Sequence, residues 1–202
     1  MKKGILFILS GPAGSGKGTV VECLLKKHPE IKLSISKTTR APRGNEIPNV
    51  NYYYVTKEDF QKSIDNNEFF EYAQYSKNYY GTPNSEVVDY LERGIDVILE
   101  IEVVGAMKVK AMHPETVTIM LTPPDSADLE RRLRGRASDS EEQILMRLAR
   151  AKEEIKSLPD YDYSVVNEFG KQEECADLIY AIMQASHRKT SLTKSIIENF
   201  IK

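Results

Sequence analysis

Short, nearly continuous apolar runs alternate with helix-like segments along most of the sequence. The runs at 5–9, 97–101 and 117–121 contain few polar residues. Such runs are typical of parallel strands that are covered on both faces. In the segments between them, apolar residues recur at helical spacing, as Val20, Val21, Leu24 and Leu25 do. The pattern therefore predicts an α/β fold, with a parallel sheet between two layers of helices.

Two further strands and several helices complete this prediction. Strands are expected at 31–36 and 164–167, besides the run that extends from 96 to 102. Core helices are expected at 19–27, 105–112 and 171–187, and a final helix packed on the body at 192–201. Prolines follow His28 and His113, and because the residue before proline avoids the α region, each marks the end of a helix.

A different pattern runs from about 50 to 80, where tyrosines and phenylalanines alternate with smaller or polar residues. Alternation with period two favours half-buried strands, which we expect at 51–55 and 69–75. Thr56 is expected to begin a short helix, and the segment 79–83 is turn-like. Pro83 can open the next helix, which Gly94 can cap. We expect a small antiparallel lobe inserted into the parallel core.

The segment from Gly11 to Thr19, Gly-Pro-Ala-Gly-Ser-Gly-Lys-Gly-Thr, stands between the first strand and the first helix. Its glycines and Lys17 fit a phosphate-binding loop, in which backbone N–H groups surround phosphate oxygens at a helix N-terminus. An ordinary strand-to-helix turn is the alternative, but the strand and helix on either side favour the loop. Gly18 stands where a Ser or Thr hydroxyl normally contacts magnesium, so the loop leaves open how the metal is held.

Composition narrows the class of protein. The chain has 202 residues, a formal charge of −2 and a pI near 6.0, which fit one acidic domain without a general attraction for nucleic acid. Cys23 and Cys175 lie far apart in expected helices, which suggests neither a disulfide framework nor a metal site. The apolar N-terminal run is too short for a secretion signal, and we find no stretch long enough to span a membrane. A soluble, cytoplasmic protein is expected.

Charged residues gather in two further segments. Arg40 and Arg43 lie in a proline-containing loop, where they could form a clamp on an oxyanion or a solvated surface. A charge-rich helical hairpin follows 125, with Gly135 as a hinge. Next to a phosphate-binding loop it is typical of a mobile lid that carries arginines to a transferring phosphate. Glu100 and Glu102 end a core strand, at the edge where open α/β sheets bind ligands.

Taken together, these segments resemble guanylate kinase, from Lys3 to about His187. The most specific matches are Thr38-Thr39-Arg40-Ala41-Pro42-Arg43 and Asn78-Tyr79-Tyr80-Gly81. Glu71-Tyr72-Ala73, Glu100-Ile101-Glu102 with Gly105, and the arginines from 132 to 136 also match. The resemblance implies ATP-dependent phosphorylation of GMP to GDP, by a core at 1–36, 96–124 and 150–187, a GMP-binding lobe at 37–92 and a lid at 125–149. Residues 188–202 are then a helical extension of one domain.

The resemblance also implies a set of site residues. ATP would be bound by Gly11, Pro12, Ala13, Gly14, Ser15, Gly16, Lys17, Gly18, Thr19, Arg136 and Asn167. GMP would be bound by Ser36, Arg40, Arg43, Glu46, Tyr52, Glu71, Tyr80, Thr82 and Glu102. The catalytic cations would be Lys17, Arg40, Arg132, Arg136 and Arg147. Mg²⁺ would be held through oxygens of ATP, the phosphoryl donor, and through water, near Glu102. Val104 stands where the family often has Gln.

The chemistry of guanine agrees with the role implied for Glu71. Guanine presents N1–H and its 2-amino group as adjacent donors, and a carboxylate presents two acceptors. Adenine presents an acceptor at N1, so it would face the carboxylate unfavourably. Two alternatives stay open: a nucleoside monophosphate kinase with another acceptor, which Gly18-Thr19 allows, and a non-catalytic interaction module. ATP and GMP are the expected partners, without nucleic acid or membrane, for a monomer or homodimer.

Overall fold

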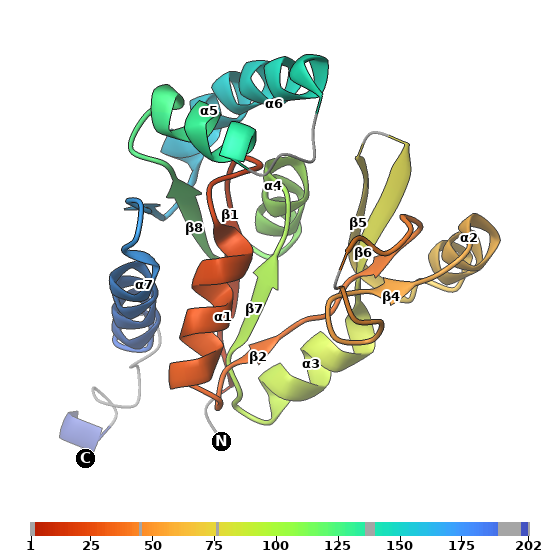
Figure 1. The fold of residues 1–202 in the computed structure, drawn as a ribbon. Coiled ribbons are helices and arrows are strands. Elements are labelled where there is room, and N and C mark those ends of the chain that lie inside the picture. The colour runs from red at the N-terminus through yellow and green to blue at the C-terminus, as the bar shows by residue number, and fades with distance from the viewer. Residues whose placement is uncertain (1–2, 45, 76, 136–139, 190–198, 202) are drawn as a thin grey trace.

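Five parallel strands form the centre of the structure, a computed structural model that describes residues 3–44, 46–75, 77–135, 140–189 and 199–201 (Figure 1). The strand order is β2-β7-β1-β8-β9, and every neighbouring pair is parallel. The strands are β1 (Leu6–Ser10), β2 (Lys32–Leu33), β7 (Val97–Glu100), β8 (Val117–Thr122) and β9 (Tyr163–Val166). The predicted parallel sheet is confirmed, although β2 is much shorter than the predicted strand at 31–36.

Helices cover both faces of this sheet, as the apolar pattern predicts. The helices are α1 (Lys17–Lys27), α3 (Asn84–Glu92), α4 (Val103–Met112) and α7 (Gln172–Ser186). Phe7 and Leu9 belong to the cluster that packs on α1 and α7, whereas Leu6 and Ile8 belong to the cluster that packs on α3 and α4. Because successive side chains of a strand point to opposite faces, β1 is buried along its whole length. The three layers are therefore present.

A second sheet lies beside the carboxyl ends of the core strands, in the order β4-β3-β6-β5. Its strands are β3 (Lys37–Thr38), β4 (Tyr53–Tyr54), β5 (Phe69–Tyr75) and β6 (Asn78–Pro83), with α2 (Lys57–Asp65) alongside. The lobe is not wholly antiparallel as predicted, because β3 pairs with β4 in parallel. Thr56 begins α2 as predicted, and its side chain accepts a hydrogen bond from the Asp59 N–H.

The prediction of a turn at 79–83 is wrong, because these residues belong to β6. This strand pairs with β5 on one side and with β3 on the other, so hydrogen bonds from two neighbours outweigh local turn propensity. A Cβ at Gly81 would lie 2.7 Å from a carbon of the Phe69 ring. Glycine here lets the aromatic ring pack against the strand rather than forming a turn.

The charge-rich segment after β8 forms the expected helical hairpin, α5 (Ser126–Gly135) and α6 (Glu141–Glu154), followed by a short 3-10 helix, Ile155–Asp160. Figure 1 shows the hairpin above the carboxyl ends of β1 and β8. Leu129 and Leu133 of α5 pack against Ile144 and Ala151 of α6. Gly135, predicted as a hinge, is the last residue of α5.

Most of the predicted tail helix at 192–201 lies outside the described residues. Residues 199–201 are helical, but the side chains of Phe200 and Ile201 are 90% and 80% exposed. The predicted packing of the tail on the body is therefore not found at these two residues. Cys23 and Cys175 are free thiols within helices, as expected. Over the described part of the chain, we find no helix with the length and apolar character needed to cross a membrane.

Candidate active site

The phosphate-binding loop connects β1 to α1, and three of its glycines have positive φ. Gly11, Gly14 and Gly16 have φ values of 145°, 98° and 94°, which side chains with a Cβ rarely adopt. A Cβ on Gly11 would lie 2.1 Å from the Leu121 carbonyl oxygen, and one on Gly16 would lie 2.5 Å from the Asn167 amide nitrogen. The loop therefore needs glycine for both its conformation and its close contacts.

Arg132 and Asn167 hold the loop from behind. The Asn167 Nδ2 donates to the Ser15 carbonyl oxygen at 2.8 Å. Arg132 donates to the same oxygen at 3.3 Å and to the Asn167 carbonyl oxygen at 2.5 Å, while Asp128 pairs with the Arg132 Nε at 2.5 Å. Helix α5 and the residue after β9 thus fix one peptide of the loop, and the structure places Arg132 and Asn167 outside the cavity lining.

The Lys17 ammonium lies across the loop. It donates to the carbonyl oxygens of Gly11 and Pro12, at 2.7 and 3.3 Å. Both carboxylate oxygens of Glu100 would lie 3.9 Å from a Cβ on Gly18. A side chain at position 18 would therefore point toward the Glu100 carboxylate, but Gly18 has no hydroxyl to place there. Burial raises the pKa of Glu100, and the charge of Lys17 opposes this shift.

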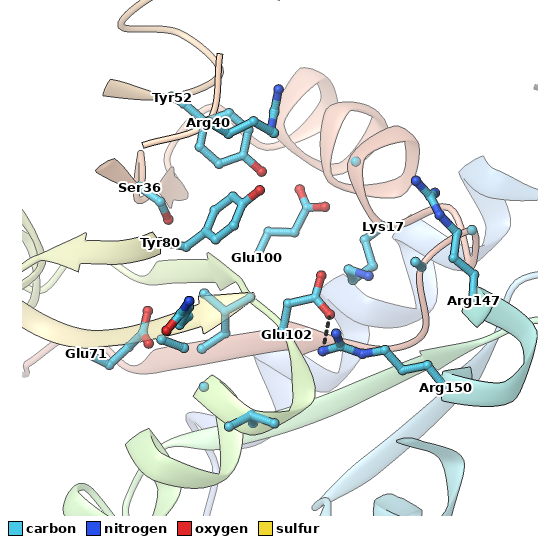
Figure 2. A pocket seen from close by; sticks show the side chains of 18 of the residues that line it. Lys17, Ser36, Arg40, Tyr52, Glu71, Tyr80, Glu100, Glu102, Arg147 and Arg150 are labelled. Atoms are coloured by element: carbon cyan, nitrogen blue, oxygen red, sulfur yellow. Dashed lines mark ion pairs between the residues drawn. The ribbon is translucent and has the colours of Figure 1, made fainter. Parts of the chain in front are cut away.

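A cavity of about 330 Å³ separates the loop from the second sheet. Figure 2 shows Lys17 and Arg147 at one end, Glu71 at the other, and Glu100 and Glu102 between them. The cavity is lined by Ala13, Gly14, Gly16, Lys17, Gly18, Thr19, Ser36, Arg40, Arg43, Tyr52, Glu71, Ala73, Gln74, Tyr80, Glu100, Ile101, Glu102, Val104, Gly105, Arg147 and Arg150. Most of the site residues predicted from the sequence are therefore brought together around one space.

At the far end of the cavity, Glu71 is buried, with 6% of its surface exposed. It lies opposite Thr82 in the pairing of β5 with β6, and the Thr82 hydroxyl donates to its Oε1 at 2.9 Å. Burial raises the pKa of the Glu71 carboxyl, and the charge of Lys108 opposes this shift. A Cβ on Gly105 would lie 3.1 Å from the other oxygen, Oε2. The absence of a side chain at Gly105 therefore leaves room for that oxygen.

Glu46 organises the loop that carries the two predicted arginines. Its two oxygens each accept a hydrogen bond from the Arg40 guanidinium at 2.9 Å. The Tyr54 hydroxyl and the Arg43 N–H also donate to it, at 2.7 and 2.8 Å. Although burial would raise the pKa of Glu46, these hydrogen bonds lower it to about 2. Arg40 also lies 5.2 Å from the centre of the Tyr52 ring, so its guanidinium is held at the cavity wall.

The remaining predicted residues lie behind this lining or outside the described residues. Gly11, Pro12 and Ser15 form the back of the loop, while Glu46 and Thr82 contact lining residues. Arg136, predicted as an ATP-binding and catalytic residue, lies outside the described residues. Each residue's role with nucleotides therefore stays a prediction.

Two lining residues of chemical interest were not among the predicted site residues. The sequence identifies Glu100 only as a carboxylate at the end of a strand. In the structure it is the last residue of β7, and its side chain lies beside Gly18 of the phosphate-binding loop. Arg150 follows Arg147 by three residues, a spacing that places both on one face of α6. From this spacing, Arg150 could have been predicted to line the site together with Arg147. Its partner Glu154 follows it by four residues on the same helix, a spacing visible in the sequence, whereas Glu102 is brought to it only by tertiary structure.

The fold and this cavity define a P-loop α/β protein, with a phosphate-binding loop that faces a second, carboxylate-containing pocket. Residues 3–185 match the family model for guanylate kinase. The chain is 45% identical to guanylate kinase from Clostridioides difficile (strain 630), covering 98% of this chain and 95% of that protein. It is 47% identical to guanylate kinase from Oceanobacillus iheyensis, covering 93% and 90%.

A solved structure agrees with these sequence matches. The crystal structure of guanylate kinase from Anaplasma phagocytophilum has a TM-score of 0.79 and 34% identity, covering 94% of this chain and 89% of that one. The chain belongs to the guanylate kinase family. Guanylate kinases are the nucleoside monophosphate kinases that act as ATP:GMP phosphotransferases.

Proposed function

We propose that this chain transfers the γ-phosphoryl group of ATP directly to GMP, and also to dGMP, and releases ADP and GDP or dGDP. The observation that carries the proposal is that the phosphate-binding loop with Lys17 and the Glu71–Thr82 pair face each other across one cavity. A loop for a polyphosphate and a buried carboxylate for a purine fit a donor and an acceptor nucleotide. Membership of the guanylate kinase family supports the same reaction.

Glu71 would select the acceptor base. Its carboxylate would accept hydrogen bonds from N1–H and the 2-amino group of guanine, and the Thr82 hydroxyl orients it from one side. Because the carboxylate is buried, a base that fails to supply two donors would leave a charge unsatisfied. The contacts of Glu71 are thus suited to guanine and poorly suited to adenine.

The acceptor phosphate would be held by side chains on the opposite wall, namely Ser36, Arg40, Arg43, Tyr52 and Tyr80. Glu46 keeps the Arg40 guanidinium in place through two hydrogen bonds. A guanidinium anchored in this way loses little further freedom when it meets a phosphate, so it can orient the acceptor at small entropic cost.

The donor phosphates would bind the N–H groups of the loop and the Lys17 ammonium. Phosphoryl transfer depends mainly on in-line alignment and on positive charge around the oxygens, which Lys17, Arg40 and Arg147 would supply. By the family match, Arg132 and Arg136 of the lid would add to this charge, and Asn167 would lie near the ATP adenine. Glu102 would lie near the acceptor base.

Magnesium bound to the phosphates would neutralise part of their negative charge. The described residues contain no group of three metal-ligating side chains of His, Cys, Asp or Glu, so a site made of protein ligands alone does not fit. Glu100 and Glu102 offer hard carboxylate oxygens at the cavity, which suit Mg²⁺ through its water ligands. These two residues would hold the hydrated ion in the absence of a hydroxyl at Gly18.

Closure of the α5–α6 lid over the cavity would exclude water, so that the phosphoryl group reaches GMP rather than solvent. The division into core, GMP-binding lobe and lid at the boundaries predicted above is part of this proposal. So are a cytoplasmic location, where both nucleotides occur, and a monomeric or homodimeric state without nucleic acid or membrane partners. Light scattering after gel filtration would measure the oligomeric state.

An assay of ADP release, with ATP and Mg²⁺ and one acceptor at a time, tests the function. The acceptors are GMP, dGMP, AMP, IMP, UMP and CMP. We expect turnover with GMP and dGMP to exceed turnover with the others by a wide margin. Faster turnover with AMP or a pyrimidine nucleotide would support a kinase with another acceptor. No turnover with any of the six would support the interaction module.

A further inference from the structure

Arg150 lies between two carboxylates that come from different parts of the fold. Its Nε donates to Glu154 Oε1 at 2.6 Å on the same helix, α6. Its Nη2 lies 3.7 Å from Glu102 Oε2, at the start of α4 (Figure 2). The guanidinium thus links the helix that returns from the lid to the end of the β7 strand.

Glu154 needs a cation because its carboxylate is withdrawn from water, whereas the Glu102 side chain is 35% exposed and only its Oε2 atom is buried. Glu154 is only 8% exposed, and burial raises the pKa of its carboxyl, as does the charge of Glu102. The Oε2 atom of Glu102 is also buried and, among the described residues, accepts no hydrogen bond. A buried carboxylate without a counter-charge is strongly destabilised, so Arg150 offsets the burial of Glu154 and places positive charge beside the buried oxygen of Glu102.

Lys17 is another cation whose positive charge acts on Glu154, and it also acts on Glu100. Its charge opposes the raised pKa of Glu154 and of Glu100. With Arg150 removed, Glu102 and Glu154 would attract the Lys17 ammonium more strongly. Lys17 would then be drawn from the carbonyl oxygens of the loop, where it is now held at 2.7 and 3.3 Å. The guanidinium of Arg150 therefore protects the orientation of Lys17.

The position of Arg150 on α6 also affects Arg147, which precedes it by almost one turn and lines the same cavity. The apolar side of α6, with Ile144 and Ala151, packs on α5. That packing does not involve the Arg150 side chain, which is 37% exposed at the cavity. Loss of Arg150 should therefore leave the hairpin folded while weakening the attachment of its returning helix to the core.

We propose that Arg150 is a positioning residue of the phosphoryl-transfer site. By holding Glu102 and Glu154, its guanidinium keeps the Lys17 ammonium on the phosphate-binding loop and keeps Arg147 at the cavity. This inference rests on the proposed function for its effect on turnover, but the interaction of Arg150 with Glu154 can be measured without nucleotides.

The test compares Arg150→Gln with Lys152→Gln, which removes the same charge from the opposite, exposed face of α6. We expect Arg150→Gln to lower kcat by about 10- to 100-fold, as small misplacements at a reaction centre do. Its KM for GMP should change by less than about threefold, since uniform binding is spared. Its Tm should fall, because Glu154 is then buried without its counter-charge, so kcat is compared at a temperature where every variant is fully folded. Lys152→Gln should match the wild type. Arg150→Lys should retain part of the activity, because it keeps the charge without the planar fork.

Adding Glu154→Gln to Arg150→Gln provides the decisive comparison. If Arg150 acts by neutralising Glu154, removing the bare carboxylate should restore several-fold of the lost kcat. If Arg150 instead contacts a phosphate directly, the double variant should be no better than Arg150→Gln, and that result would overturn the proposal. Equal kcat values for Arg150→Gln and Lys152→Gln would also overturn it.

A titration of the Glu154 side-chain carboxyl by carbon NMR gives a readout that is independent of activity. The signal is assigned by its loss in Glu154→Gln. The groups that face this carboxyl are Arg150, Glu102, Lys17 and the Tyr161 hydroxyl. The pKa of Glu154 should rise in Arg150→Gln, because the guanidinium that stabilises the ionised carboxylate is gone, and stay unchanged in Lys152→Gln. An unchanged pKa in Arg150→Gln would refute the interaction. Inactivity of the wild type toward GMP would refute the function instead.

Discussion

At the scale of single residues, the site has a buried carboxylate, Glu71, at one end and a lysine ammonium, Lys17, at the other. Glu71 is buried against the Thr82 hydroxyl at the end of the cavity opposite the phosphate-binding loop, whereas Lys17 is held by the loop's own carbonyl oxygens. Their separation across the cavity means that one residue can be changed without disturbing the other. Base selection and phosphoryl transfer should therefore be separable by mutation.

Lys17→Met should nearly abolish turnover and leave GMP binding largely intact. The ammonium would stabilise charge on the transferring phosphoryl group, which GMP alone does not carry, so we expect kcat to fall by about 1,000-fold or more. Calorimetry should give a Kd for GMP within about threefold of the wild type. Lys26→Met, on the exposed side of α1, is the matched control. A rate like that of the wild type would show that the loop lysine is not catalytic.

Glu71→Gln should weaken the preference for guanine. The amide keeps one acceptor but directs an N–H donor at the donors of guanine, so kcat/KM for GMP should fall by about 100-fold or more. IMP lacks the 2-amino group and should lose less, which narrows the ratio of GMP to IMP. Glu58→Gln, at an exposed position of α2, controls for loss of charge in the lobe. An unchanged ratio of GMP to IMP would contradict the role of Glu71.

At the scale of elements, two loops are held in place by contacts from other segments. Asn167 at the end of β9 holds the Ser15 carbonyl of the phosphate-binding loop. Glu46 holds Arg40 and Arg43 in the loop before β4. Asn167 holds its loop through one buried hydrogen bond and Glu46 holds its loop through several, so removal of either side chain should have a specific consequence.

Asn167→Ala should loosen the phosphate-binding loop. It removes a buried hydrogen bond to Ser15, and we expect the free energy of unfolding to fall by about 1–3 kcal/mol. The KM for ATP should rise more than the KM for GMP, because the loop would serve the donor. Glu168→Ala, at the adjacent exposed position, is the control. Equal changes in both KM values would argue against a local effect on the loop.

The ionised carboxylate of Glu46 should stabilise the folded protein, and this contribution should be lost in acid. Its pKa in the folded protein is about 2, below the ordinary value for glutamate, so its ionised form is favoured by folding. The stability that it contributes is therefore complete above about pH 4.5 and is lost as the pH falls toward 2. Glu46→Gln should lower Tm at pH 7, and this difference should shrink as the pH falls to 2. A difference that does not depend on pH would contradict the interaction of Glu46 with Arg40.

The elements of the core were predicted well from the sequence because local pattern and tertiary environment agree there. Continuous apolar runs predicted β1 and β8 within about a residue at each end, and β7 within about two. The second sheet was predicted less well. Residues 79–83 carry turn-forming Gly81 and Pro83, and only pairing with β3 and β5 makes them a strand. The short strand β3 was read as part of a loop, since its two residues gain their structure from neighbours.

The candidate site was predicted in two different ways. The strand–loop–helix context of Gly11 to Lys17 identified a phosphate-binding loop by physical reasoning alone. The lobe residues, such as Glu71 and Arg43, needed the family resemblance, because a lone carboxylate or arginine has no local signature. Arg150 is not among the predicted site residues, because only folding brings it to Glu102 and to the cavity, and its pairing with Glu154 four residues later is typical of any helix surface.

At the scale of the whole molecule, the core, the second sheet and the lid hairpin surround one cavity (Figure 1). The core supplies the loop, the second sheet supplies the buried Glu71 of the proposed purine pocket, and α6 places Arg147 and Arg150 at the cavity. Bringing the two nucleotides to opposite ends of one cavity allows the phosphoryl group to move in a single displacement, without a phosphorylated side chain as an intermediate. The geometry therefore predicts the stereochemistry of the reaction as well as its products.

The most direct test follows the configuration at phosphorus when ATP with a γ-phosphoryl group made chiral by oxygen isotopes reacts with GMP. A single in-line transfer from ATP to GMP predicts inversion, read from the β-phosphate of the GDP product. Retention of configuration would show two displacements and a protein-bound intermediate. Either retention or failure to form GDP from GMP would contradict direct transfer across this cavity.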